Sequence, residues 1–270
     1  MPVLYVVATP IGNLEDITLR ALRTLREVKL IAAEDTRKTK RLLAAYDIKA
    51  PLTSYHEHNK VTKLDYILGC LADGDVALVS EAGMPGMSDP GYELIVAASG
   101  QGVPVVPIPG PSAVITALVV SGLPARQFHY LGFLPRRAGS RRRLLQSVAD
   151  GPATIVVLEA PHRLPETLDD MLLTLGDRKI AVCRELTKIY EEVFRGKISQ
   201  AREHFAEPRG EFTLVIEGRS EMARPLVTGD IRRRLHGMRS SGVKAKEAIA
   251  RVAGETGLSR KELYRVWLES

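Results

Sequence analysis

Apolar and polar positions alternate in a regular way along the first 121 residues of the chain. Short apolar runs rich in β-branched residues predict strands at 3–8, 30–33, 52–55, 76–80 and 103–108. Segments with helical spacing of apolar residues lie between and after them, at 17–28, 39–46, 61–72, 90–100 and 112–121. This alternation predicts an α/β domain built on a largely parallel sheet.

The pattern restarts after the turn Gly122-Leu123-Pro124. Strands are predicted at 128–133, 154–158, 180–183, 191–195 and 212–217, and helices at 140–149, 164–175 and 198–206. The last strands lie close together in the sequence, so antiparallel pairs are expected among them. This part is therefore predicted to be a second α/β domain with a mixed sheet.

Beyond Glu217 the apolar strands stop, and three short helices are predicted at 230–237, 244–255 and 260–268. Gly257 marks a turn, Ser259 suits a helix N-cap, and Glu262 completes a capping box. Two interpretations remain open for this segment: a helix-turn-helix, or a small helical cap that packs on the body. The predicted organisation is thus two α/β domains, at 1–121 and 122–222, and a helical tail at 223–270.

The composition is that of an ordinary globular protein. The chain has 270 residues, of which 45% are hydrophobic and 26% charged, which excludes a disordered or fibrous chain. No apolar run approaches the roughly 20 residues of a membrane helix, and the first residues resemble a strand rather than a signal peptide. A cytoplasmic location is expected by default.

The net charge of +6 is concentrated near the C-terminus. Residues 224–270 hold 11 lysines and arginines against 5 acidic residues, whereas residues 1–223 hold 27 of each kind. Such a basic segment suits a partner that carries phosphates. A second basic cluster, at 136–143, contains five arginines within eight residues, and a guanidinium cluster at a domain junction favours nucleic-acid contact over a solvated face.

Two loops rich in glycine and proline follow predicted strands. The loop 80–91 holds three glycines and two prolines and exceeds the roughly 2–6 residues typical of such connections, which favours ligand contact through its backbone. Its Asp89-Pro90 pair also suits a helix start. The loop 107–113 opens a helix whose free N–H groups could hold a carboxylate, although Ser112 would also serve as a plain N-cap.

The loop 9–16 after the first strand lacks the glycines of a dinucleotide-binding loop. Only Gly12 is present, so no pyrophosphate cradle is predicted, although Glu34-Asp35 mimics the acid that grips a ribose in dinucleotide folds. Asp16 is interpreted as the N-cap of the first helix or as a ligand contact. In the second domain, charged residues cluster at 158–163 and 184–188, at the ends of strands, which predicts a cleft between the domains.

The cysteines and histidines predict no metal site. Cys70 and Cys183 stand alone, outside any zinc or disulfide pattern, and are interpreted as small buried apolar residues. His56 and His58 would face the same side of an extended segment, but no third ligand is evident.

Seven motifs together resemble the ribosomal RNA small subunit methyltransferase I family within the tetrapyrrole-methylase superfamily. They are TPIGNL at 9–14, AEDTR at 33–37, SYHEHN at 54–59, SDPG at 88–91, PGPSA at 109–113, PHR at 161–163 and RELTK at 184–188. The basic helical tail is also similar to that family's C-terminal domain. Relatives that act on tetrapyrroles have a first loop of the G-x-G-x-G-D type, whereas residues 10–14 of this chain are PIGNL. This difference favours the members of the superfamily that methylate RNA.

The resemblance implies two α/β domains with S-adenosylmethionine in the cleft between them, and a homodimer. The implied reaction is 2′-O-methylation of a cytidine in 16S ribosomal RNA, within a small ribosomal subunit. Glu81, Met84, Gly86-Met87, Leu158 and Ala160 depart from the family's usual residues. The implied cofactor contacts are Pro10, Gly12, Glu81, Gly83, Met84, Met87, Pro111, Ser112, Ala113, Leu158, Glu159, Ala160, Glu211, Phe212 and Thr213.

A base that accepts the hydroxyl proton would be a carboxylate or an imidazole at the cleft. The candidates are Glu81, Glu159, His162 and Glu185. The candidates for RNA contact are Arg37, Arg136, Arg137, Arg141, Arg142, Arg143, Arg163, Lys244, Arg260 and Lys261. Two alternatives remain. The first is a methyltransferase that acts on a tetrapyrrole-like small molecule, which would not explain the basic segments. The second is a non-catalytic RNA-binding protein, in which the two loops would have no role.

Overall fold

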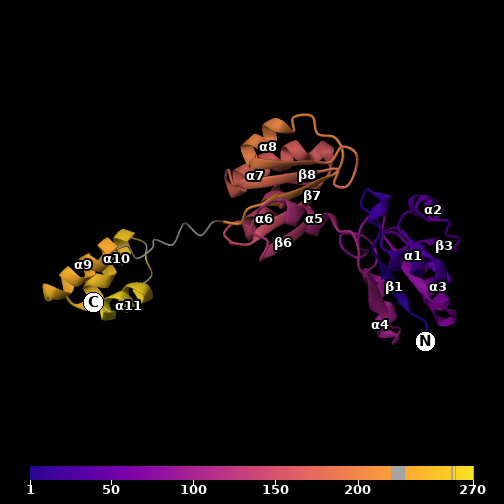
Figure 1. The fold of residues 1–270 in the computed structure, drawn as a ribbon, viewed down its shortest axis with the longest axis horizontal. Coiled ribbons are helices and arrows are strands. Elements are labelled where there is room, and N and C mark those ends of the chain that lie inside the picture. Colours follow the sequence, from indigo (N-terminus) through magenta and orange to yellow (C-terminus); the bar gives the residue numbers. More distant parts are fainter. Residues whose placement is uncertain (220–228, 257, 259, 270) are drawn as a thin grey trace. The chain divides into compact units, whose positions relative to one another are not determined.

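The structure is a computed structural model that describes residues 1–219, 229–256, 258 and 260–269, without the side chains of Lys261, Glu262 and Glu269. The described residues form two compact units, Met1–Gly218 and Arg219–Ser270 (Figure 1). Both sheets belong to the first unit. The finer division at 121 and 222 stays a prediction.

The first sheet is entirely parallel, as predicted. Its strands run in the order β3-β2-β4-β1-β5. They are β1 (Leu4–Val7), β2 (Leu30–Ala33), β3 (Leu52–Ser54), β4 (Val76–Val79) and β5 (Val105–Ile108). Helices α1 (Leu19–Glu27) and α2 (Thr36–Ala45) pack on one face, and α3 (Lys60–Asp73) and α4 (Tyr92–Gly100) on the other. Because β1 lies between β4 and β5, the loops after these three strands lie at one edge, where open α/β sheets bind ligands.

The second sheet is mixed, as predicted, with the order β6-β7-β10-β8-β9 and a single parallel pair, β6 with β7. Its strands are β6 (Phe128–Phe133), β7 (Thr154–Glu159), β8 (Lys179–Arg184), β9 (Glu192–Lys197) and β10 (Phe212–Ile216). Helices α6 (Ala138–Val148), α7 (Leu164–Leu175) and α8 (Ile198–His204) cover one face. The other face is covered by α5 (Ala113–Val120). The sequence pattern had instead placed this helix in the first predicted domain, residues 1–121.

Several helix starts differ from the predictions. Asp16 ends a short 3₁₀ turn, η1 (Leu14–Asp16), and the N-cap of α1 is Thr18, whose hydroxyl accepts a hydrogen bond from the Ala21 N–H at 3.1 Å. Helix α4 begins at Tyr92, because Gly91 leaves the helical conformation with a φ of 150°. Asp35 is the N-cap of α2, where its side chain accepts hydrogen bonds from the Arg37 and Lys38 N–H groups. The prediction that Ser112 caps α5 is confirmed.

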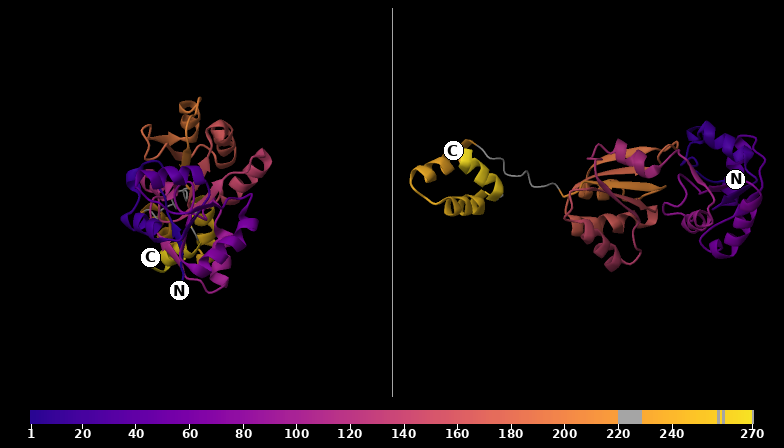
Figure 2. Two further views of the ribbon diagram at one scale, coloured as in Figure 1. Left: turned by 90° about the vertical axis from the view of Figure 1, so that its right-hand side faces the viewer. Right: turned by 90° about the horizontal axis from the view of Figure 1, so that it is seen from below.

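The second unit contains α9 (Gly229–Ser240), α10 (Ala245–Thr256) and α11 (Arg260–Glu269), which confirms the three predicted helices (Figure 2). They share a core of their own that includes Leu235, Val252 and Trp267. The predicted turn at Gly257 and N-cap at Ser259 lie outside the described residues, as does the Glu262 side chain. None of the helices in the described residues is long and apolar enough to cross a membrane.

Candidate functional site

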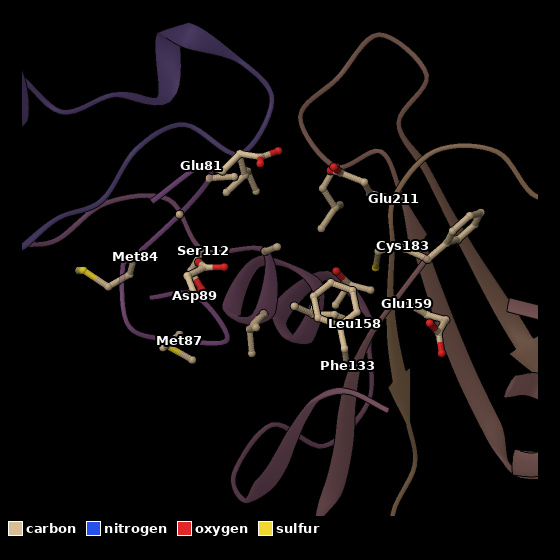
Figure 3. Close-up of a pocket in the computed structure, with 18 of the residues that line it drawn as sticks. Glu81, Met84, Met87, Asp89, Ser112, Phe133, Leu158, Glu159, Cys183 and Glu211 are labelled. Carbon is tan, nitrogen blue, oxygen red and sulfur yellow. The ribbon is translucent and has the colours of Figure 1, made fainter. Parts of the chain in front are cut away.

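A cavity of about 430 Å³ lies where the loops after β1, β4 and β5 meet the strand ends of the second sheet (Figure 3). We refer to it as the first cavity. Its volume lies within the roughly 300–1,000 Å³ of small-molecule sites. Its lining consists of Ile11, Glu34, Glu81, Ala82, Gly83, Met84, Met87, Asp89, Ser112, Ala113, Val114, Tyr130, Phe133, Leu158, Glu159, Ala160, Pro161, Cys183, Leu186, Glu211, Phe212 and Thr213.

The loop 80–91 is held in a shape that depends on glycine. Gly83 and Gly86 adopt φ values of 78° and 84°, which side chains disfavour. The backbones of Gly83 and Thr9 exchange two hydrogen bonds, of 2.9 and 3.0 Å, and so tie this loop to the one after β1. Ser88, also at positive φ, bonds through its hydroxyl to the Tyr130 hydroxyl at 2.7 Å. The loop is thus fixed to both halves of the unit.

Most of the cofactor contacts implied by the resemblance line the first cavity. The exceptions are Pro10 and Gly12, which lie in a second cavity described below, and Pro111, which lines neither. Sequence reasoning did not assign several lining residues to the cofactor site, notably Glu34, Asp89, Tyr130, Phe133 and Cys183. Glu34 had been noted only together with Asp35, as a mimic of a ribose-binding acid, and Asp89 only as part of the loop 80–91 and of a helix start.

The first cavity is acidic. Five carboxyl groups line it, and none of the described lysines, arginines or histidines does. The lining carboxyls are those of Glu34, Glu81, Asp89, Glu159 and Glu211. The remaining surface is largely apolar, with side chains such as Met84, Met87 and Leu158. A cavity with these walls attracts a cation that also has apolar parts.

Burial shifts the pKa of two of these carboxyl groups upward. Burial and the neighbouring carboxylate of Glu34 raise the pKa of Asp89 to about 7, against a hydrogen bond from Ser80. Burial likewise raises the pKa of Glu34, whereas Lys38 opposes the shift. The Glu81 N–H donates to the Glu34 carboxylate at 2.9 Å, which links the ends of β2 and β4. Asp89 therefore changes charge near neutral pH.

The four predicted candidates for the base occupy different environments. Glu81 is exposed at the cavity wall and forms an ion pair with Lys38. Glu159 lines the cavity but is fully buried, where it accepts a hydrogen bond from Thr167 at 2.7 Å and pairs with Arg163 at 3.4 Å. Glu185 and His162 line neither cavity. The structure thus leaves Glu81 as the candidate that is both exposed and in the cavity.

A second cavity, of about 300 Å³, adjoins the first. Ile11, Glu81, Ala82 and Glu211 line both, so the two cavities share a wall. The other residues of the second cavity are Thr9, Pro10, Gly12, Leu14, Lys38, Thr39, Arg41, Leu42, Ser80 and Lys188. Three of these side chains are cationic, in contrast to the first cavity.

The second cavity is closed on one side by the loop after β8. Lys188 Nζ lies 2.9 Å from a Glu185 oxygen and 2.8 Å from a Glu211 oxygen. Burial raises the pKa of Glu185, but hydrogen bonds from Lys188 and from the Glu211 N–H outweigh it and lower the pKa overall. Gly12 fits beneath this loop only because it has no side chain, since a Cβ there would lie 2.5 Å from Lys188 Cγ. The Asn13 N–H also donates to Thr187 Oγ1 at 3.1 Å.

The residues predicted to contact RNA separate into two groups. Arg141 is 3% exposed and pairs with Asp170 at 2.6 Å, and Arg163 donates to the Leu134 carbonyl at 2.6 Å. These two guanidinium groups are engaged within the fold, so the exposed arginines and lysines are better placed for RNA, and the assignment itself stays a prediction. The exposed members are Arg37, Arg136, Arg137, Arg142, Arg143, Lys244 and Arg260, and the side chain of Lys261 lies outside the described residues.

Among the described residues, no group of three or more histidine, cysteine or acidic side chains is arranged to hold a metal ion. Cys183 is buried as expected, and burial raises the pKa of its thiol to about 11, whereas Cys70 is half-buried. The ring centroids of His56 and His58 lie 6.1 Å apart. The thiol of Cys183 therefore contributes to the cavity wall as a neutral group.

Comparison with known proteins identifies similar sequences. The family model described as "Tetrapyrrole (Corrin/Porphyrin) Methylases" matches residues 3–202. A protein of Halalkalibacterium halodurans named "Ribosomal RNA small subunit methyltransferase I" is 48% identical, over 98% of this chain and 94% of its own. Proteins of the same name from Synechocystis and Bacillus subtilis are 46% and 45% identical, covering 100% and 98% of this chain and 98% and 93% of theirs.

Solved structures support the fold. A uroporphyrin-III-C-methyltransferase from Thermus thermophilus aligns with a TM-score of 0.60 at 20% identity, over 80% of this chain and 94% of that one. Another structure of that enzyme, complexed with S-adenosylhomocysteine, aligns with a TM-score of 0.58 at 23% identity, over 80% of this chain and 97% of that one. At 20–23% sequence identity, the similarity to these structures supports the fold alone.

Proposed function

Because this chain belongs to the ribosomal RNA small subunit methyltransferase I family of the tetrapyrrole methylases, we propose that it transfers a methyl group from S-adenosylmethionine to the 2′-hydroxyl of a cytidine in 16S ribosomal RNA. The methyltransferase class follows from the family. The choice of a cytidine and of its ribose oxygen is the part that requires a test.

The observation that carries the proposal is the carboxylate-lined first cavity. S-Adenosylmethionine carries a sulfonium and an ammonium group against a single carboxylate, so it is a cation overall, and it supplies an activated methyl group when bound. The acidic walls at Glu34, Asp89 and Glu211 complement these two positive charges, and the apolar surface at Met84 and Leu158 suits the uncharged parts. The donor set of the cavity therefore fits this cofactor.

The loop 80–91 and the start of α5 would position the cofactor. Gly83 and Ala113 line the cavity with little side-chain bulk, and Ser112 already uses its hydroxyl to cap α5. Methyl transfer requires three atoms in line, so rigid placement supplies a large part of the acceleration. The hydrogen bonds of the loop to Thr9 and Tyr130 provide that rigidity.

Glu81 is the group best placed to accept the hydroxyl proton. It lines both cavities, so it lies at the wall where a bound cofactor and a substrate in the second cavity would meet. Geometry within reach of the proton is the first requirement of a general base. Glu159 satisfies its oxygens with Thr167 and Arg163 and is assigned to hold β7 and α7 together.

The test is methyl transfer followed by mapping. The protein is incubated with methyl-labelled S-adenosylmethionine and either small ribosomal subunits or naked 16S ribosomal RNA, and the labelled nucleotide is located by nuclease digestion and mass spectrometry. The proposal expects one labelled cytidine that carries the methyl group on its ribose. Label on a base, or on a tetrapyrrole supplied in place of RNA, would replace the proposal with another acceptor.

We also propose a homodimer, as the resemblance implies. Ile115 and Val119 of α5 are 49% and 69% exposed, and this apolar strip would be buried between two copies. Light scattering of the wild type and of Val119→Glu checks it: a dimeric mass that becomes monomeric supports this surface. A monomeric wild type contradicts it.

A further inference from the structure

The second cavity is built for a negatively charged group. Lys38, Arg41 and Lys188 bring three cations into about 300 Å³, whereas Glu81 and Glu211 stand only on the wall shared with the first cavity. The two cavities thus differ in the sign of the charge that lies outside the shared wall. A cationic cofactor and an anionic substrate would be sorted between them by this difference alone.

The cations of the second cavity are available to a ligand to different degrees. Lys38 and Lys188 are held by carboxylates of the shared wall. Arg41 is exposed on α2, and no ion pair joins it to a residue in the described part of the chain. A guanidinium group presents a fork of donors that matches two oxygens of a phosphate. Arg41 is therefore the cation that a phosphate can engage without breaking an existing ion pair.

We propose that the second cavity holds a backbone phosphate of the RNA, next to the nucleotide that is methylated, with Arg41 as its principal contact. The proposal rests on the proposed function, because it assumes that RNA is the acceptor. The chemistry of the ribose supports it: the 2′-hydroxyl and the 3′-phosphate sit on neighbouring carbons. A phosphate in the second cavity would place the reacting oxygen at the shared wall, beside Glu81.

The loop that closes the second cavity adds a surface for an unpaired nucleotide. Directly after Lys188, Ile189 is 95% exposed and Tyr190 is 73% exposed. Cations beside exposed aromatic side chains are the combination by which proteins hold single-stranded nucleic acid, because bases stack on the ring while the backbone follows the charges. A flipped or single-stranded nucleotide is therefore the form of RNA that this site accepts.

The experiment compares Arg41→Gln with Lys40→Gln. Both substitutions remove one exposed positive charge from α2, but only Arg41 lines the second cavity. Binding of 16S ribosomal RNA is measured by filter retention at several salt concentrations in the presence of S-adenosylhomocysteine, so that no turnover is needed. Cofactor binding is titrated in parallel, and thermal unfolding confirms that both variants fold.

We expect Arg41→Gln to weaken RNA binding about tenfold and to reduce the slope of log affinity against log salt by about 0.7, the value for one phosphate of a single strand. Lys40→Gln should change the affinity less than twofold, and cofactor affinity should be unaltered in both. Equal losses in the two variants would indicate diffuse surface charge and overturn the phosphate site, as would two unchanged variants of a protein that still methylates RNA. A wild type that neither binds nor methylates RNA overturns the proposed function as well.

Discussion

The two adjoining cavities differ in charge although they share four residues. The first is lined by carboxyl groups and apolar side chains, and the second gathers three cations around its outer part. The difference arises from the elements that supply the walls. The first cavity draws on the loop 80–91 and on β7 and β10, whereas the second draws on α2 and the loop after β8. One fold thus offers separate places for a positively charged donor and a negatively charged acceptor, and their common wall is where the two would react.

The largest expected effect concerns that common wall. Glu81→Gln keeps the size of the side chain but removes the proton acceptor, so single-turnover methyl transfer should fall by about 100- to 10,000-fold. Cofactor affinity should stay within a few-fold of the wild type, because other carboxyl groups of the first cavity remain. Glu185→Gln is the comparison, since Glu185 lines neither cavity, and it should lower the rate far less. Equal rates for Glu81→Gln and the wild type would exclude Glu81 as the base.

A second prediction separates two carboxylates of the first cavity by their burial. Glu159→Ala leaves Arg163 and Thr167 without their buried partner, so the free energy of unfolding should fall by about 3 kcal/mol. Glu211 is 72% exposed, and Glu211→Ala should change the free energy of unfolding by less than about 0.5 kcal/mol. Denaturant unfolding measures both. A stable Glu159→Ala variant would contradict the structural role assigned to Glu159.

The third prediction concerns Gly12, beneath the loop that closes the second cavity. In Gly12→Ala the new Cβ would meet Lys188 Cγ at 2.5 Å and the Leu186 carbonyl at 3.0 Å, so the loop must move. We expect a loss of about 1–3 kcal/mol in the free energy of unfolding and weaker RNA binding. Gly69→Ala is the control: nothing lies within 4 Å of its Cβ in α3, and the gain in helix propensity should stabilise it by up to about 1 kcal/mol. Similar effects in both variants would show that the loop does not press on Gly12.

The smallest effect is a pH dependence confined to the first cavity. Asp89 has a pKa of about 7, so its ionised fraction rises about tenfold between pH 6 and pH 8. Affinity for the cationic cofactor should rise over that range by up to the same factor, and Asp89→Asn should flatten the profile. For stability the sign is opposite: a raised carboxyl pKa costs stability as the pH rises from 3.8 to about 7, so Asp89→Asn should unfold at a higher temperature than the wild type at pH 8. Titration calorimetry and thermal melts at several pH values check both, and parallel profiles for wild type and variant would contradict the role of Asp89.

The strand and helix pattern of the first unit could be predicted from the sequence, because apolar periodicity reports which faces are buried. The predicted strand 128–133 and helix 164–175 coincide with β6 and α7. The position of α5 could not be predicted, since its apolar residues would fit either sheet and only tertiary packing places them against Val156 and Val215.

The candidate site could be predicted where loops have an unusual composition, but not where the role of a residue depends on its burial. The glycines of the loop 80–91 indicated a ligand site, and most of the implied cofactor contacts do line one cavity. Arg141 looked like its exposed neighbours in the arginine run, and only the structure shows it paired with Asp170. Likewise, nothing in the sequence indicated that Arg41 and Lys188, almost 150 residues apart, line one cavity.

The binding of cofactor and RNA in separate cavities is tested most directly with two variants, Asp89→Asn and Arg41→Gln, at pH 8. S-Adenosylmethionine and 16S ribosomal RNA are each titrated into the wild type and into both variants. We expect Asp89→Asn to weaken the cofactor and to leave RNA affinity within about twofold, and Arg41→Gln to weaken RNA about tenfold and leave cofactor affinity unchanged. If each substitution weakened both ligands equally, or neither, the assignment of a cationic donor to the first cavity and an anionic acceptor to the second would be wrong.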